Sequence, residues 1–362
     1  MATDGAHRRL AYAGDEGDAI GHGENDGYVL SLARTHSPET SRDPALVTTA
    51  VRVSPVVAAA LRDGRPVVAL ESSVFAQGLP QPQNRDAAGR MLAAVRARGA
   101  EPAITAVARG TPIVGLDGDD LERFLARDGV RKVSARDIAP AAATCADGAT
   151  TVAGSLVLAH AAHIAVLATG GIGGVHRVAP TLAHGGDVVR DESADLAELA
   201  RTPMLVVCAG AKTILDLPAT MERLESLGVA VVGYRVDELP GFLTSGTGIS
   251  LSWRFESAAE VAAAWRTQRD LGRMQAMVVV QPAPTPLPRE MVDDAVDRVL
   301  DAAVRAGISG TALTPWLLAR LETETGGASL ATNVALLESN ATLAAEIASE
   351  VANDAEIGRA RA

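Results

Sequence analysis

Two lysines stand out in a chain that otherwise carries its positive charge on arginine. Among 33 basic residues, only Lys132 and Lys212 are lysines. An arginine guanidinium stays protonated at any reachable pH, whereas a desolvated lysine amine can lose its proton and act as a nucleophile. We therefore interpret these lysines as candidates for chemistry that arginine cannot perform, with chance retention on the surface as the alternative.

Lys212 has the more informative surroundings. It follows the apolar, strand-like run "MLVVCAG" (204–210) and opens a predicted helix over residues 211–228. A cation in the first turn of a helix opposes the helix dipole, so a structural lysine is better placed elsewhere. The helix end and the apolar strand both favour the neutral amine. The pattern predicts that Lys212 attacks a carbonyl-like carbon.

Other polar residues also follow strand-like runs. Glu71 lies near the end of "PVVALESS" (66–73), where it is either a general acid or base or a solvated loop carboxylate. The stretch "TGGIGGVHR" (169–177) is either a phosphate-binding loop or a tight turn. It lacks the dinucleotide fingerprint, because His176 stands where the third glycine belongs, and this disfavours a dinucleotide-dependent oxidoreductase.

Two helix starts carry further candidates. "GATTVAG" (148–154) contains Thr151, whose hydroxyl either caps a helix or binds a phosphate. "RDESADLAEL" (190–199) begins with Asp191, Ser193 and Asp195, which are either first-turn caps or metal ligands.

The elements that must position these residues alternate regularly. We predict buried strands at 66–73, 101–108, 164–171, 204–210, 229–236 and 275–282, and helices at 54–64, 84–99, 150–163, 211–228, 257–272, 289–307 and 333–351. Strand–helix alternation with only 3% aromatic residues favours an α/β fold with a mixed, mostly parallel sheet. We predict one domain over residues 47–352, a disordered extension at 1–46 and a flexible tail at 353–362.

Composition excludes several classes of protein. A net charge of -11 and a pI near 5.2 argue against a nucleic-acid-binding surface. No apolar run is long enough to span a membrane, and the N-terminal stretch has no secretory signal pattern. The two cysteines show no metal-ligand spacing, which predicts buried free thiols and a cytoplasmic location.

Taken together, these stretches resemble one family, the pseudouridine-5'-phosphate glycosidases, also called the indigoidine synthase A-like family. The resemblance runs from about Ser54 to Val351 and keeps the order of the motifs. These are "ALESS", "GLPQPQN", "KVSARD", "GATTVAG", "ATGGIGGVHR", "SADLAEL", "VVCAGAKTILDLPAT", "GYRVDELPGF", "TPWLLARL" and "SLATN".

The resemblance implies a three-layer α/β/α sandwich, a homotrimer, one Mn²⁺ per subunit and a carbon–oxygen hydro-lyase. The expected reaction is reversible cleavage of the C1'–C5 bond of pseudouridine 5'-phosphate into uracil and ribose 5-phosphate. It proceeds through a ring-opened lysine adduct of the Schiff-base type. A separate pseudouridine kinase would supply the substrate, and no nucleic acid or membrane is expected as a partner.

The family pattern also assigns roles to residues. Lys212 corresponds to the nucleophile, Glu71 to the proton donor and acceptor, and Asp191 to the manganese ligand. Together with Thr151, the expected substrate-binding residues are Lys132, Val152, His176, Ser193, Ala194, Asp195 and Asn333.

Three departures from the family keep two alternatives open. Gln77 stands where the family commonly has histidine, Gln281 stands where it has asparagine, and the connection between Arg177 and Asp191 is longer than usual. One alternative is a Schiff-base lyase that acts on another phosphorylated sugar or C-nucleoside. The other is a non-catalytic homologue that binds sugar phosphates, although binding alone does not require lysine rather than arginine.

Overall fold

The computed structural model describes residues 51–177, 191–308 and 313–361, with side chains described up to residue 353. The predicted disordered extension, residues 1–46, lies outside the described residues, as does the whole connection between Arg177 and Asp191, residues 178–190. The chain divides into two units, residues 1–44 and 45–362, and every described helix and strand lies in the second.

One mostly parallel sheet organises the fold. Its strand order is β1-β4-β3-β2-β7-β8-β11-β9-β10, with β6 pairing with both β3 and β5. The pairs β3–β4 and β3–β6 are antiparallel, and the remaining pairs are parallel. The strands are β1 Arg52–Val53, β2 Val67–Glu71, β3 Glu101–Ala108, β4 Thr111–Val114, β5 Arg131–Val133, β6 Gly148–Thr150, β7 Val166–Ala168, β8 Leu205–Cys208, β9 Ala230–Tyr234, β10 Arg254–Phe255 and β11 Met277–Val280.

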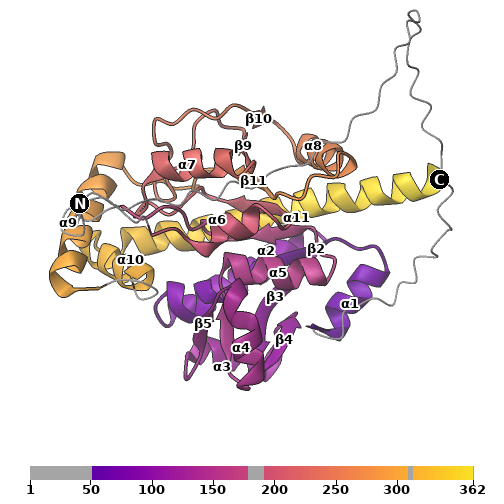
Figure 1. Ribbon diagram of the computed structural model, residues 1–362, viewed down its shortest axis with the longest axis horizontal. Helices are drawn as coiled ribbons and strands as arrows, with labels where there is room; N and C mark the ends of the chain where they lie inside the picture. The colour runs from indigo at the N-terminus through magenta and orange to yellow at the C-terminus, as the bar shows by residue number, and fades with distance from the viewer. Residues whose placement is uncertain (1–50, 178–190, 309–312, 362) are drawn as a thin grey trace, which may run out of the picture. The chain divides into compact units, whose positions relative to one another are not determined.

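Helices cover both faces of this sheet, which gives the predicted three-layer α/β/α architecture (Figure 1). On one face α11 packs on β2, β7 and β8 and contacts α2 and α8; on the other, α5 packs on β2 and β3 and contacts α6. The helices are α1 Pro55–Arg62, η1 Val74–Gly78, α2 Gln83–Ala97, α3 Gly118–Ala126, η2 Ala135–Asp137, α4 Ile138–Ala143, α5 Val152–Ala161, α6 Ala194–Leu199, α7 Leu217–Ser226, α8 Ala258–Asp270, α9 Arg289–Ala306, α10 Leu313–Glu324 and α11 Ala328–Arg361.

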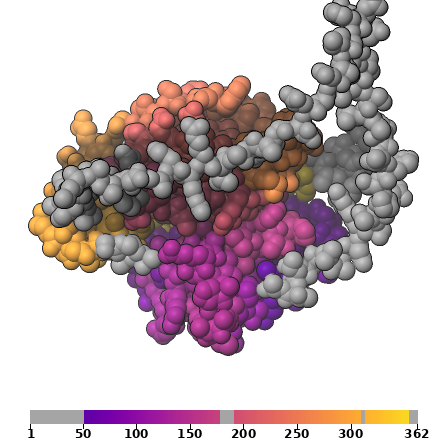
Figure 2. Space-filling view, in the orientation of Figure 1, coloured from indigo at the N-terminus to yellow at the C-terminus, as the bar shows by residue number. Residues whose placement is uncertain are grey.

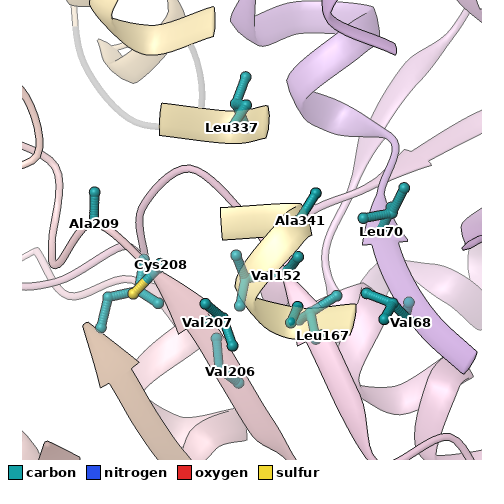
Figure 3. Close-up of a cluster of buried hydrophobic side chains, with 14 of the residues drawn as sticks. Val68, Leu70, Val152, Leu167, Val206, Val207, Cys208, Ala209, Leu337 and Ala341 are labelled. Atoms are coloured by element: carbon teal, nitrogen blue, oxygen red, sulfur yellow. The ribbon is translucent and has the colours of Figure 1, made fainter. Parts of the chain in front are cut away.

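The core lies where the central strands meet α5 and α11. Figure 3 shows Val68, Leu167 and Val206 of three neighbouring strands close to Val152 of α5 and Ala341 of α11. Each of these side chains is fully buried. Small aliphatic residues let the helices approach the sheet closely, so this core fixes the ends of β2, β7 and β8.

The sheet joins the two halves of the chain at the β2–β7–β8 seam. In Figure 2 the segments from α2 to α5 (indigo to magenta) form the lower part of the described surface, and those from α7 to α8 (salmon to orange) form the upper part. Beside this seam, β3 changes partner: β2 pairs with it as far as Thr105, and β6 pairs with the next two residues. The chain therefore leaves β2 at Glu71 next to the start of α5.

The predicted strands are all present, although most are shorter than their apolar runs. The helix predicted from residue 54 is α1, and Ser54 caps it, since its hydroxyl accepts a hydrogen bond from the Val57 N–H at 3.5 Å. The prediction of two buried thiols is right for Cys208 and wrong for Cys145, which follows the end of the short helix α4 and is exposed. The predicted tail, residues 353–362, is helical up to Arg361, and its flexibility stays a prediction.

Candidate active site

The carboxyl ends of β2, β7 and β8 open onto one cavity of about 360 Å³. Ligands of α/β sheets collect at this edge, because loops there lead into helix starts. The structure brings every site residue predicted from the sequence to the cavity wall. These residues are Glu71, Lys132, Thr151, Val152, His176, Asp191, Ser193, Ala194, Asp195, Lys212 and Asn333.

Lys212 lies on a turn between β8 and α7. Its N–H donates to the Ile172 carbonyl at 3.2 Å, and α7 begins only at Leu217, capped by the Asp216 carboxylate. The prediction that Lys212 sits in the first turn of a helix is therefore wrong. The chain makes the turn because Gly210 adopts a φ of +88°, which glycine tolerates. A helix dipole therefore cannot support a chemical role for Lys212. The support comes from the half-buried position of Lys212 in the cavity.

Glu71 is buried at the end of β2, with 5% of its surface exposed. This rules out the solvated loop carboxylate considered above. Thr169 and Ser73 hydroxyls donate to its two carboxylate oxygens at 2.5 and 2.8 Å. Burial raises the pKa of Glu71, while the Lys212 charge and the two hydrogen bonds act in the opposite direction. The site thus holds a carboxyl group that keeps its proton to higher pH than usual.

Two further titratable groups face the same cavity. Lys132 lies in β5 at the cavity wall and is exposed, and desolvation by the surrounding protein together with the positive charge of Lys212 lowers its pKa. Burial also lowers the pKa of His176, and Asp191 opposes this shift. The cavity therefore gathers two amines, an imidazole and a protonatable carboxyl group, which suits proton transfer around a covalent amine adduct.

The glycine-rich stretch packs against protein rather than forming a phosphate cradle. The N–H groups of Ile172, Gly173 and Val175 donate to protein oxygens at 3.1, 2.9 and 3.0 Å. A Cβ on Gly173 would collide with the Ser193 side chain. These glycines let the loop pass close to its neighbours, so the phosphate-binding interpretation of these N–H groups is wrong.

Asp195 ties two parts of the cavity wall together. Its carboxylate oxygens accept hydrogen bonds from the N–H groups of Ala153 and Gly173, each at 2.9 Å. Thr151 and Ser193 cap α5 and α6, at 3.5 and 3.2 Å, as the capping interpretation predicted. All three residues nevertheless line the cavity, and Asp195 holds the start of α5 against the glycine-rich loop.

Comparison with known proteins identifies the family of this arrangement. A family model described as indigoidine synthase A like protein matches residues 56–350. The chain is 58% identical over 299 residues to the pseudouridine-5'-phosphate glycosidase of Gemmatimonas aurantiaca, covering 82% of this chain and 95% of that protein. It is 48% identical over 298 residues to the enzyme of the same name from Herpetosiphon aurantiacus, covering 82% and 96%. The chain belongs to the indigoidine synthase A-like family.

Solved structures agree with this family fold. A prealnumycin C-glycosynthase, solved in complex with ribulose 5-phosphate, matches with a TM-score of 0.77 and 35% identity and covers 85% of this chain and 99% of that one. An indigoidine synthase A-like protein from Thermotoga maritima matches with a TM-score of 0.74 and 30% identity, covering 83% and 96%.

Sequence reasoning missed several residues of this family member's site. Ser73 and Thr169 hold the catalytic candidate Glu71, and Phe242 lines the cavity from the loop after β9. Ser73 and Thr169 were within reach, because each lies within two residues of the end of a strand. Phe242 had no such signal, since its φ of +63° is visible only in the structure.

The departures from the family pattern fall in different places. Gln77 lines the cavity. Gln281 instead donates through Nε2 to Asn340 Oδ1 at 3.0 Å, and Asn340 Nδ2 donates to the Thr169 carbonyl at 2.9 Å. Gln281 therefore supports the strand end that carries Thr169, whereas Gln77 faces whatever the cavity binds.

A Mn²⁺ ion at Asp191 would have few protein ligands among the described residues. Among the described residues, no three His, Cys, Asp or Glu side chains gather closely enough to hold a metal. Asp191 offers one exposed carboxylate at the cavity wall. A hard divalent cation of this kind is often bound by one or two carboxylates, with waters and substrate oxygens completing its shell. Asp191 thus suits a water-rich site rather than a closed one.

Proposed function

We propose that this chain catalyses the reversible cleavage of the C1'–C5 bond of pseudouridine 5'-phosphate to uracil and ribose 5-phosphate. The observation that carries this proposal is the meeting of both lysines of the chain with buried Glu71 in one cavity. Relatives up to 58% identical are named for this glycosidase activity. A carbon–carbon glycosidic bond lacks an ordinary leaving group, which makes covalent amine catalysis the chemically suitable route.

In the first step, the neutral Lys212 amine attacks C1' of the ribose. The N–C1' bond forms, the C1'–O4' bond breaks, and O4' takes the proton of Glu71. The raised pKa of Glu71 keeps this proton available to higher pH than in an ordinary carboxyl group. The proton released by the Lys212 nitrogen then returns to Glu71.

In the second step, the base leaves. Glu71 protonates C5 of the base, the nitrogen lone pair forms a C1'=N iminium bond, and the electrons of the C1'–C5 bond pass into the uracil ring. Water then adds to C1' and displaces Lys212, which gives ribose 5-phosphate. Each proton that Glu71 donates is recovered from the lysine nitrogen or from water, so the cycle closes.

Cationic and hydroxyl groups suit the sugar phosphate. Lys132 and Arg136 line the cavity beside Thr151, whose helix α5 presents its N-terminus there. Val152, His176, Ser193, Ala194 and Asn333 complete the proposed substrate-binding wall. Asp191 would hold one Mn²⁺ per subunit, which supplies positive charge to substrate oxygens when bound.

The proposal extends to the working state of the protein. Following the family, the enzyme acts as a homotrimer, and a separate kinase that phosphorylates pseudouridine supplies its substrate. No described helix combines the length and the apolar composition needed to cross a membrane. A cytoplasmic location remains part of the proposal. The molar mass of the protein in solution, measured by light scattering, tests the trimer directly.

Intact-mass measurement after incubation with ribose 5-phosphate and borohydride tests the covalent step. We expect a reduced adduct that maps to Lys212 and is absent from Lys212→Ala. Lys132→Arg is the matched control, because it leaves Lys212 as the only side-chain amine, and its adduct should persist. Absence of an adduct from the wild-type protein, or of uracil release from pseudouridine 5'-phosphate, would contradict the proposal.

A further inference from the structure

A smaller cavity of about 120 Å³ adjoins the active-site cavity. The two share Gln77, Phe242 and Asn333 in their walls, so they are neighbouring compartments. The smaller one is bounded further by Arg127 of the turn after α3 and Glu322 of α10. None of the steps above uses it.

Polar atoms at this compartment are buried without partners. Among the described residues, Arg127 Nε and Nη2, Gln77 Oε1 and Asn333 Oδ1 make no hydrogen bond. Asn333 is 8% exposed, and desolvation lowers the pKa of Arg127. Buried polar atoms without partners are costly, and the nitrogens of a charged guanidinium more so. A bound group that satisfied them would recover this free energy.

The unpaired atoms specify the chemistry of that group. Two guanidinium N–H donors require acceptors, and two amide oxygens require donors. The Gln77 amide is oriented by its other end, since Nε2 donates to the Val130 carbonyl at 3.3 Å. An inorganic anion would satisfy only Arg127 and would face the Glu322 carboxylate on the same cavity wall. A ring with alternating carbonyl and N–H groups satisfies both kinds of atom.

Phe242 adds a flat apolar surface between the compartments. Its ring packs against Gly171, where an added Cβ would lie 2.7 Å from a ring carbon. Its φ of +63° is a strained conformation for an aromatic residue. The Phe242 N–H donates to the Ala209 carbonyl at 3.0 Å, which places the ring close to the strand end that precedes Lys212.

We propose that this compartment is the nucleobase subsite, in which Arg127, Gln77 and Asn333 bind the carbonyl and N–H edge of a six-membered cyclic imide such as uracil. The inference rests on the proposed function. Arg127 and Gln77 are then specificity-determining residues for the leaving base, and Gln77 reads it with an amide acceptor where the family commonly has histidine.

Kinetics in the synthetic direction, with uracil and ribose 5-phosphate varied separately, tests the assignment. Arg127→Met should raise the KM for uracil by about 10- to 100-fold, the usual loss for a hydrogen bond to a charged group. The KM for ribose 5-phosphate should change less than about twofold, as should the yield of its borohydride-trapped adduct. Gln77→Leu should raise the KM for uracil in the same selective way.

Two further variants keep the test decisive. Arg62→Met removes an exposed arginine that lines neither cavity, and it should behave as wild type. Arg127→Lys keeps the charge without the planar fork, and it serves if Arg127→Met fails to fold. An unchanged KM for uracil, or an equal loss for both substrates, would overturn the subsite. A wild-type protein inactive in both directions would instead overturn the proposed function.

Discussion

At the scale of single residues, Glu71 and Lys212 depend on each other. Burial favours the protonated form of the Glu71 carboxyl group, and the nearby positive charge of Lys212 favours the ionised form. Glu71 is therefore a carboxyl group whose proton responds to the state of the lysine. When Lys212 is neutral and attacks the sugar, its charge no longer favours the ionised form of Glu71. The Glu71 carboxyl group then retains more strongly the proton that it transfers to O4'.

Glu71→Gln tests this acid role. Glutamine keeps the shape, its carbonyl oxygen can accept one of the two hydrogen bonds from Thr169 and Ser73, and its NH₂ group can donate to the other hydroxyl, but it cannot donate an acidic proton. We expect kcat for uracil release to fall by about 10²- to 10⁴-fold, as for loss of a general acid. Ser73→Ala is the matched control, because it removes one hydrogen bond to Glu71 and leaves the proton in place. Retention of full activity by Glu71→Gln would exclude Glu71 as the acid.

Glu71→Gln should also change how the free energy of unfolding depends on pH, in a direction that the pKa shift fixes. The folded-state pKa of Glu71 is raised above its unfolded value, so its contribution to folding is present below the unfolded pKa and is lost as pH rises through the folded pKa. Urea unfolding of wild type and Glu71→Gln should show the variant gaining relative stability as pH rises. If the difference in unfolding free energy between wild type and Glu71→Gln does not change with pH, folding does not shift the pKa of Glu71.

Asp191 makes a separate prediction about the metal. Manganese binding, followed by loss of the electron paramagnetic resonance signal of free aqueous Mn²⁺, should weaken by about 10- to 100-fold in Asp191→Asn, since one charged ligand is lost. Glu192→Gln is the control, because Glu192 lies next in sequence and its carboxylate is paired with Arg223 at 3.0 Å. Equal Mn²⁺ binding by wild type and Asp191→Asn would remove Asp191 as the ligand.

Most of the residues that line the active-site cavity were predictable from the sequence, but the surroundings of each side chain were not. Rare lysines and a carboxylate at a strand end indicated Lys212 and Glu71 without any structure. The sequence placed Phe242 at the end of a family motif without giving it a role, and it did not indicate Arg127; both adopt positive φ angles at turns, +63° and +70°. Such conformations follow from packing between distant segments rather than from local sequence preference.

At the scale of elements, the strand ends position the site and the glycine-rich loop fills the space between them. The strands were predictable, because buried parallel strands read as continuous apolar runs. The start of α7 was not predictable. Residues 211–216 have residue types that are compatible with a helix, but they form β-bridges to Ile172 and His176 instead. Tertiary pairing of the turn overrode the local helical preference.

Glycine substitutions test how tightly this loop is packed. Gly173→Ala would place a Cβ against Ser193 and the Asp195 carboxylate, so we expect lower stability and a loss of kcat together. Gly89→Ala is the matched control: Gly89 lies within α2 and has nothing within 4 Å of an added Cβ. The control should stabilise the protein by about 0.5–1 kcal/mol in chemical denaturation. If Gly173→Ala left both stability and kcat unchanged, the loop would not be tightly packed at Gly173.

At the scale of the whole molecule, the chain carries a net charge of -11 and yet places both of its lysines at one cavity. A polyanion would meet net repulsion from a chain of this charge, whereas a single small phosphate ester can enter a local positive site. This contrast favours a free nucleotide over RNA as the substrate.

Truncation tests which part of the chain this activity needs. The family match covers residues 56–350, and every residue assigned to the site lies within the unit 45–362. A chain beginning at residue 47 should therefore keep kcat/KM for pseudouridine 5'-phosphate within about twofold of the full chain, since no group that binds or reacts is removed. Thermal unfolding of both chains should give the same midpoint. If the shorter chain loses activity but unfolds at the same temperature, the first 46 residues contribute to catalysis or to assembly, and the domain boundary predicted at residue 47 is wrong in function.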